Sequence, residues 1–209
     1  MAPALSPAVA GSFAQGFADP VHDSQAAFRA VMRAMARPGT IETLGFNMAS
    51  PPLPLPVAAA AACLALADFE TPLWLSPSLQ RGTAIADYLR FHTGAPLANA
   101  PNGAAFVVVD ARCDPLDLAE FAQGTVEYPD RGATVILICD HLGAELSLSL
   151  SGPGIQKIAE LGFSPMPDGF AKQWAINRAA FPLGVDMILA ASNTLACLPR
   201  STRILAEAV

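Results

Sequence analysis

The sequence predicts a single α/β domain with a mixed, largely parallel sheet flanked by helices. Two nearly continuous β-branched runs, AAFVVVD at 104–110 and ATVILICD at 133–140, are typical of strands covered on both faces. Helical patterns alternate with these strands along the chain. A third segment, ELSLSLS at 145–151, alternates strictly and favours a half-exposed antiparallel strand. No repeat or linker divides the 209 residues, so one domain is expected.

The first predicted element is a helix. It begins at Asp23-Ser24, because both are good N-cap residues, and it ends at Pro38-Gly39. One helical face is apolar, with residues at i, i+3, i+4 and i+7: Phe28, Val31, Met32 and Met35. Another face carries arginines at four-residue spacing: Arg29, Arg33 and Arg37. The arginine face indicates a solvated surface or, in a chain with few charges, a contact with an acidic partner or a phosphate.

The remaining elements follow in chain order from apolar runs and turn residues. Residues 1–18, rich in Ala, Pro, Gly and Ser, predict an irregular leader before the α/β domain at 19–209. The expected strands and loops are TIETL (40–44), a Pro-rich loop (50–56), PLWL (72–75), a turn at SGPGI (151–155), and a hairpin formed by VDMILAAS (185–192) and LACLP. The expected helices are 57–67, 77–91, 114–121 and 168–180.

Charge is unusually sparse in this chain. Charged residues form 14% of it, against about 25% in a typical soluble domain. Either a membrane or another protein chain is expected to cover the apolar surface. The longest charge-free apolar stretch, 57–67, is far too short to span a bilayer, and no basic segment precedes an apolar one at the N-terminus. We therefore expect a cytoplasmic oligomer or complex subunit. The net charge of −6 argues against nucleic-acid binding.

Few residues carry recognisable chemistry. The four cysteines and three histidines are dispersed, which predicts reduced thiols and no metal site. A Cys139–His141 pair fits a buried thiol beside a surface histidine better than an activated nucleophile. Neither lysine, Lys157 or Lys172, lies in a pyridoxal phosphate motif, so no cofactor is expected. The Ser151–Gly154 turn fits a tight turn better than a phosphate cradle, since Pro153 removes one N–H donor.

A low-charge sequence makes its polar clusters candidates for a ligand or partner site. One follows the Ala-rich helix and contains Asp68 and Thr71, and another lies at a helix end and contains Arg90 and His92. Helix-end Arg and His also satisfy free carbonyls, so capping is the alternative interpretation. The candidate residues are Arg90, His92, Asp68, Thr71, Arg33 and Arg200.

From about Ala18 onward the sequence resembles the PhnH family, a subunit of the bacterial carbon–phosphorus lyase system. The segments that carry the resemblance are DPVHDSQAAFRAVMRAMARPGTI (19–41), LALADFETPLWL (64–75), LRFHTGAPL (89–97), SGPGI (151–155) and FPLGVDMILAASNTLACLPRSTRI (181–204). The resemblance implies a reduced fold related to pyridoxal-phosphate-dependent transferases, without the cofactor. It also implies a homodimer when isolated and a complex with PhnG, PhnI and PhnJ.

The resemblance implies an accessory, non-catalytic subunit of a transferase. That complex forms ribose 1-methylphosphonate 5-triphosphate from ATP and an alkylphosphonate. No catalytic residue is implied, and no iron–sulfur cysteine motif is present. Two alternatives remain open: a free-standing nucleotide- or phosphonate-binding enzyme that uses Arg90 and His92, and a cryptic pyridoxal phosphate enzyme.

Overall fold

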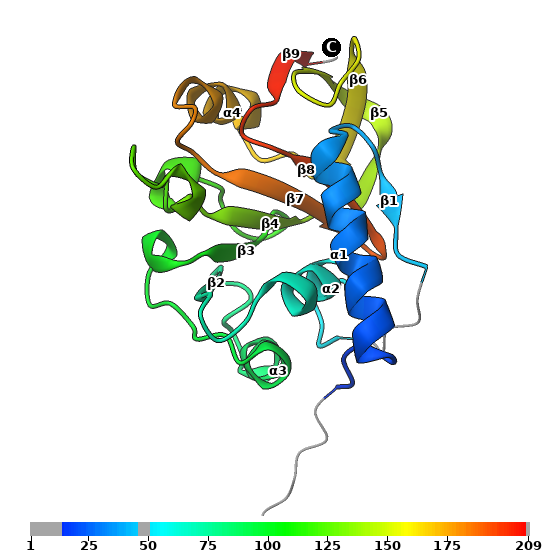
Figure 1. The fold of residues 1–209 in the computed structure, drawn as a ribbon, viewed down its shortest axis with the longest axis vertical. Coiled ribbons are helices and arrows are strands. Elements are labelled where there is room, and N and C mark those ends of the chain that lie inside the picture. The colour runs from blue at the N-terminus through cyan, green and yellow to red at the C-terminus, as the bar shows by residue number, and fades with distance from the viewer. Residues whose placement is uncertain (1–13, 46–50, 208–209) are drawn as a thin grey trace, which may run out of the picture.

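A six-stranded sheet forms the central layer of the protein (Figure 1). The structure is a computed structural model that describes residues 14–45 and 51–207, with side chains except at 144–147 and 206–207. The strands run in the order β1-β8-β7-β4-β3-β2, with β2, β3, β4 and β7 parallel and β7-β8 and β8-β1 antiparallel. Their bounds are β1 Glu42–Thr43, β2 Leu73–Leu75, β3 Phe106–Asp110, β4 Thr134–Ile138, β7 Asp186–Ala191 and β8 Thr194–Leu198. The predicted mixed sheet is confirmed.

The central strands β3, β4 and β7 are buried on both faces. Val108, Ile136 and Ile188 pair in register and contribute to the core on one face. The residues preceding them in each strand contribute to the core on the other face: Val107, Val135 and Met187. Because each strand needs apolar side chains in both directions, its sequence is a continuous apolar run.

Three helices cover the first face: α1 (Pro20–Ala36), α2 (Val57–Leu66) and α3 (Ala84–Thr93). The contact between α1 and α2 is lined by alanine, with residues 58–62 and Cys63 of α2 fully buried. The buried residues of α1 are Ala27, Ala30, Val31 and Ala34. The expected apolar face is therefore only partly the core face, because Phe28 and Met32 are 46% and 50% exposed. Small side chains allow close helix packing, which places the alanines rather than the larger residues inward.

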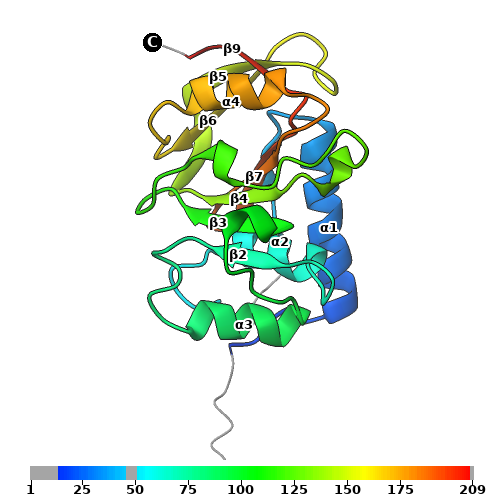
Figure 2. The same ribbon diagram turned by 90° about the vertical axis from the view of Figure 1, so that its left-hand side faces the viewer.

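The fold is completed by a second sheet, by α4 (Phe170–Ala179) and by three short 3₁₀ turns. These turns are Pro101–Gly103, Leu118–Glu120 and Pro129–Arg131. The second sheet is antiparallel, in the order β6-β5-β9, with bounds β5 His141–Ser151, β6 Ala159–Ser164 and β9 Arg203–Glu207. It lies with α4 at the end of the molecule opposite α3 (Figures 1 and 2). The predicted antiparallel strand at 145–151 is confirmed within β5.

Several element boundaries differ from the sequence-based expectation. The first helix begins at Pro20, because Asp19 rather than Asp23 accepts the N–H groups of Val21 and His22. The helix expected at 77–91 begins at Ala84, and that expected at 114–121 is a single 3₁₀ turn. Strands β6 and β9 were not predicted. Position 50 of the Pro-rich loop and positions 1–13 of the leader lie outside the described residues. Within the described part, no helix is long and apolar enough to span a bilayer.

Candidate functional site

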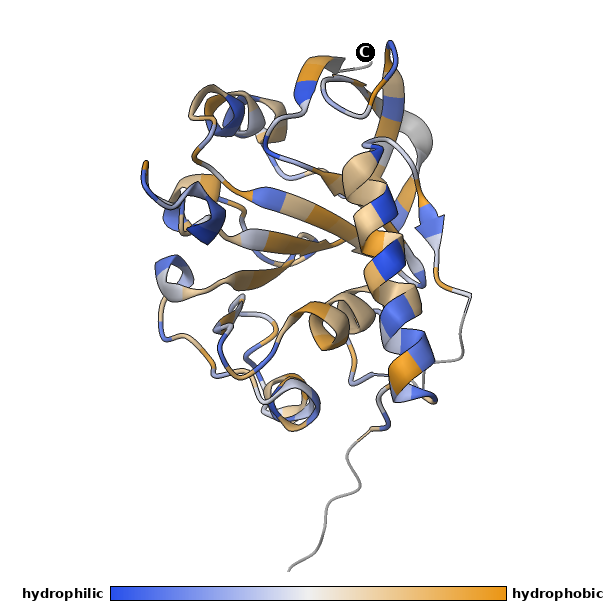
Figure 3. Ribbon diagram, in the orientation of Figure 1, coloured by the Kyte–Doolittle hydropathy of each residue, from blue (hydrophilic) through white to orange (hydrophobic). Residues whose placement is uncertain are grey.

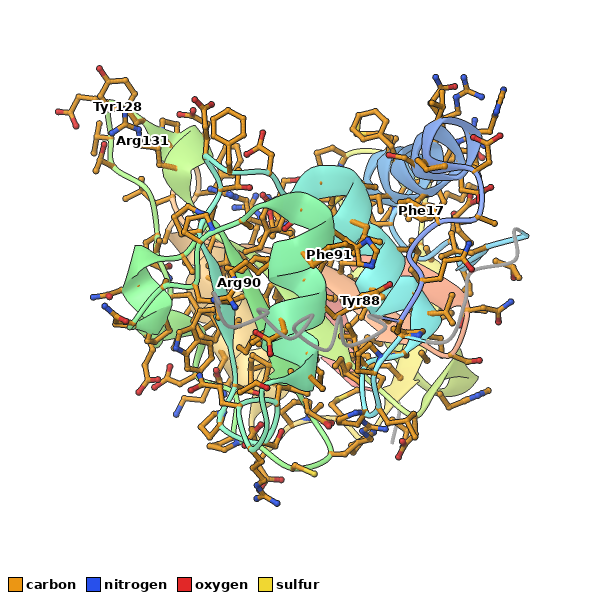
Figure 4. The ribbon with its side chains drawn as sticks, turned by 90° about the horizontal axis from the view of Figure 1, so that it is seen from below. Phe17, Tyr88, Arg90, Phe91, Tyr128 and Arg131 are labelled. Carbon is orange, nitrogen blue, oxygen red and sulfur yellow. The ribbon has the colours of Figure 1, made fainter. Side chains whose placement is uncertain are left out.

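The predicted pair Arg90 and His92 lies on α3, but the two side chains point in different directions. Positions i and i+2 of a helix do not share a face. Arg90 donates to Asp87 at 2.8 Å, whereas His92 Nε2 lies 2.9 Å from the carbonyl oxygen of Ala14. Figure 4 shows Arg90 on the side of α3 opposite Phe91 and Tyr88. The two residues therefore do not converge on one ligand position.

His92 instead fixes the start of the described chain to the helical layer. Its ring makes edge contacts with Tyr88 and Phe91, at centroid distances of 4.6 and 5.0 Å. A side chain at Gly16 would come within 2.9 Å of its Nδ1 atom, so the segment passes close to the ring. Burial raises the pKa of Tyr88 to about 12. The arrangement is suited to anchoring residues 14–17.

Asp68 and Thr71 form a closed turn between α2 and β2. The Thr71 hydroxyl accepts the Asp68 N–H at 2.7 Å and donates to the Asp68 carbonyl oxygen at 3.0 Å. The turn lies beside the end of α3, because a Cβ atom at Gly94 would be 3.7 Å from the Cβ atom of Phe69. The structure thus brings this turn near the Arg90–His92 region, with its polar groups bonded locally.

The other two candidates, Arg33 and Arg200, do not pair with the Arg90–His92 region and have carboxylate partners of their own. Arg33 on α1 donates to Glu42 of β1 at 2.7 and 3.0 Å, and this hydrogen bond raises the pKa of Arg33. Arg200 donates to Asp186 at the start of β7 at 2.7 Å. Its guanidinium also donates to the carbonyl oxygens of Pro129 and Pro182. Arg200 therefore ties three chain segments together.

A polar cluster at the carboxyl ends of the parallel strands was not predicted. Asp110 ends β3, is 1% exposed and accepts two hydrogen bonds from the guanidinium of Arg112. Arg112 also lies 3.6 Å from Asp140, which follows β4. Such edges are where ligands usually bind in open α/β sheets. The sequence contained a signal for this cluster, since both β-branched runs end in Asp. In the structure, Asp110 and Asp140 neutralise Arg112, so its charge is not left for a ligand.

Three of the four cysteines, Cys63, Cys139 and Cys197, are buried, and Cys113 is exposed. Cys139 is buried, its pKa is raised by burial to about 12, and His141 two residues on is exposed. Burial likewise raises the pKa of Cys63 to about 12. The buried Cys139 and the exposed His141 confirm the interpretation of a buried thiol beside a surface histidine. Among residues 14–45 and 51–207, no cluster of three or more His, Cys, Asp or Glu side chains could hold a metal ion.

The surface feature that stands out is an apolar stripe on α1, formed by Val21, Phe28 and Met32. These residues are spaced at i, i+7 and i+11, so they share one side of the helix, and their exposed fractions are 62%, 46% and 50%. Figure 3 shows apolar and polar bands alternating along α1. Large exposed apolar side chains grouped on one helix are typical of an interaction surface.

The fold and its surface thus define a single-domain α/β protein whose candidate polar residues are held in internal pairs. A family model described as "Bacterial phosphonate metabolism protein (PhnH)" matches residues 15–205. The chain therefore belongs to the PhnH family.

Two relatives agree with this assignment. The chain is 38% identical over 192 residues to the alpha-D-ribose 1-methylphosphonate 5-triphosphate synthase subunit PhnH of Rhizobium meliloti strain 1021, covering 92% of this chain and 95% of the relative. It is 36% identical over 180 residues to the putative C-P lyase subunit protein HtxG of Stutzerimonas stutzeri, covering 86% and 85% of the two chains.

Proposed function

We propose that this protein is an accessory, non-catalytic subunit of a carbon–phosphorus lyase complex. It would support formation of ribose 1-methylphosphonate 5-triphosphate from ATP and an alkylphosphonate. The observation that carries the proposal is the similarity, over nearly its whole length, to a protein named as a subunit of that synthase. The second relative is also named as a C-P lyase subunit.

The described side chains fit a supporting role better than a catalytic one. Arg33, Arg90 and Arg200 are each engaged by a carboxylate of the same chain. The polar groups of the Asp68–Thr71 turn bond to one another. A catalytic centre requires converging groups with a position for the substrate between them. The polar groups of these residues are bonded to other parts of the same chain instead.

The partners expected from the family are PhnG, PhnI and PhnJ in the complex, and a second copy of this chain when isolated. A cytoplasmic location is part of the same proposal. A distant relation of the fold to pyridoxal-phosphate-dependent transferases is also part of this proposal. Both lysines are exposed, so neither offers a buried position for a Schiff base with that cofactor.

We assign the partner contact to the α1 stripe of Val21, Phe28 and Met32. Burying these side chains removes apolar area from water, worth roughly 25 cal/mol per Å² before the costs of association. Arg29, on the adjacent side of the helix, has no carboxylate partner within the described residues and supplies a polar rim. The sparse charge of the whole chain is consistent with a surface that is partly covered in the assembly.

The test is co-expression of this chain with PhnG, PhnI and PhnJ of the same organism, followed by affinity capture and mass determination by light scattering. A stable complex that contains all four proteins supports the proposal. A chain that remains outside an intact complex of the other three contradicts it. Calorimetry of the isolated chain with ATP and methylphosphonate tests the alternative of a free-standing enzyme.

The α1 contact is tested with the double variant Phe28→Glu and Met32→Glu. A matched control, Val126→Glu and Ile176→Glu, changes two apolar residues that are 79% and 64% exposed away from α1. The α1 variant is expected to leave the complex while retaining the wild-type circular dichroism spectrum, and the control is expected to stay in it. An α1 variant that assembles normally would refute the assignment of this surface.

A further inference from the structure

Two glycine turns that are far apart in the sequence lie against each other beside the end of α1. The first is Arg37–Thr40, and the second is Gly152–Lys157 between β5 and β6. A Cβ atom at Gly154 would overlap the carbonyl oxygen of Ala36, and one at Gly39 would lie 2.6 Å from the Cβ atom of Ala159. Figure 1 shows the C-terminal end of α1 beside β6. Both glycines are therefore required for the two backbones to approach.

A pocket of about 620 Å³ lies where these turns meet. Arg37 of the first turn and Lys157 of the second line this pocket, and both residues are exposed. Neither cation has a carboxylate within ion-pair distance among the described residues, unlike Arg33, whose guanidinium pairs with Glu42. Two uncompensated positive charges thus share one pocket in a protein of net charge −6.

The carboxylate of Glu160, next to the pocket residue Ala159, is engaged elsewhere. Glu160 follows Ala159 in β6, so its side chain leaves the strand on the opposite face, and it accepts a hydrogen bond from Ser149 at 2.9 Å. The C-terminal end of α1 contributes a partial negative charge of roughly half an elementary charge. The two cations outweigh it, and the pocket stays positive.

Three residues that line the pocket, Gln156, Lys157 and Ile158, are consecutive. No hydrogen bond within the described residues uses their backbone N–H groups. Gly154 has φ +81°, a conformation that glycine favours and that changes the direction of the chain at this turn. Successive free N–H groups beside cationic side chains are the chemistry that proteins use to bind oxyanions.

We infer that this pocket binds a multiply charged phosphate-type oxyanion, with Arg37 and Lys157 supplying charge and residues 156–158 supplying N–H donors. The inference goes beyond the subunit role and does not depend on it. The ligand chemistry is common to the polyphosphate of a nucleotide and to a small phosphonate dianion. A planar guanidinium and a mobile ammonium together suit a tetrahedral anion whose oxygens point in several directions.

The experiment uses the full chain and inorganic tripolyphosphate as the probe. Calorimetry at low ionic strength is expected to show binding that weakens with added salt. The variant Arg37→Gln/Lys157→Gln is expected to lose affinity at least about tenfold, since two charge-assisted contacts are removed. The matched control Arg81→Gln/Lys172→Gln removes two exposed cations from other surfaces and is expected to bind as the wild type does.

Amide NMR shifts locate the anion. Addition of tripolyphosphate is expected to move the resonances of Gly39, Gln156, Lys157 and Ile158. Absence of these shifts at millimolar probe, or an equal loss of affinity in the control variant, overturns the inference. Parallel titrations with ATP and methylphosphonate separate the two sources, because tighter binding of ATP indicates a polyphosphate site. Complex formation is measured separately, so failure of anion binding leaves the subunit proposal unaffected.

Discussion

Arg112 donates to both carboxylate oxygens of Asp110, from Nε to Oδ1 and from Nη2 to Oδ2, each at 2.7 Å. Asp110 lies at the end of β3 and is 1% exposed, whereas the Arg112 side chain is 30% exposed. The hydrogen bond to Asp110 raises the pKa of Arg112. Nη2 also donates to the carbonyl oxygen of Pro54. The pair therefore holds the proline-rich loop against the carboxyl edge of the sheet.

Replacement of Arg112 by Met is expected to destabilise the protein by roughly 2–3 kcal/mol, because it leaves the Asp110 carboxylate buried without its countercharge. Urea denaturation followed by circular dichroism measures this. The control Arg90→Met removes a surface ion pair of one helix and is expected to cost under about 0.5 kcal/mol. Equal losses in the two variants would show that the Asp110 pair contributes no more than a surface pair.

Gly154→Ala is expected to destabilise the protein by more than about 2 kcal/mol. The new methyl group would overlap the carbonyl oxygen of Ala36, and the residue would also hold a positive φ. Gly169 provides the matched control, because it has φ +66° and a methyl group added there would meet open space. Gly169→Ala therefore measures only the cost of holding alanine at a positive φ, which is about 1 kcal/mol. If thermal unfolding ranks the two variants equally, α1 and the 152–157 turn do not pack as described.

Stability is expected to fall as pH rises above 9, because the buried thiols hold their protons in the folded state. Burial raises the pKa of Cys63 and Cys139 from 9.0 to about 12. At pH values between 9.0 and about 12, these thiols lose their protons in the unfolded chain but keep them in the folded chain. Each thiol therefore lowers the free energy of unfolding by up to about 1.4 kcal/mol per pH unit.

The measurement is urea unfolding at a series of pH values from 9.0 upward. Cys139→Ala is expected to make the decline with pH less steep, whatever its effect on the stability at neutral pH. The control Gly169→Ala changes no ionisable group and is expected to leave the decline with pH unchanged. A decline that is identical in wild type and in Cys139→Ala would contradict the role of this thiol.

Sequence patterns located the strands and helices best where burial dictates the residue type. The runs at 104–110 and 133–140 became β3 and β4, since strands covered on two faces tolerate little else. The helix at 77–91 was predicted too long, because side-chain contacts of its first residues, one of them long-range, decide where it starts. Asp114 accepts the Ser78 N–H, and Gln80 donates to the Leu75 carbonyl oxygen, which keeps this segment in turns.

The candidate site was harder to predict than the fold. Arg90 and His92 were grouped by adjacency in sequence, but a helix separates positions i and i+2 onto different sides. Arg37 was predicted on the arginine face of the first helix, and Lys157 was assigned no role. Only the packing of Gly154 against Ala36 brings them to one pocket. A single sequence contains no record of such contacts between distant turns.

The sequence by itself determined the α/β class, the buried central strands and the family, because these depend on periodicity and on motifs that are local in the chain. It also predicted an apolar face of α1 made of Phe28, Val31, Met32 and Met35. Only the tertiary structure showed that the buried residues of this helix are Ala27, Ala30, Val31 and Ala34. The alanine-lined surface of α2 accepts only small side chains at close range, so the alanines pack inward and Phe28 and Met32 remain at the surface.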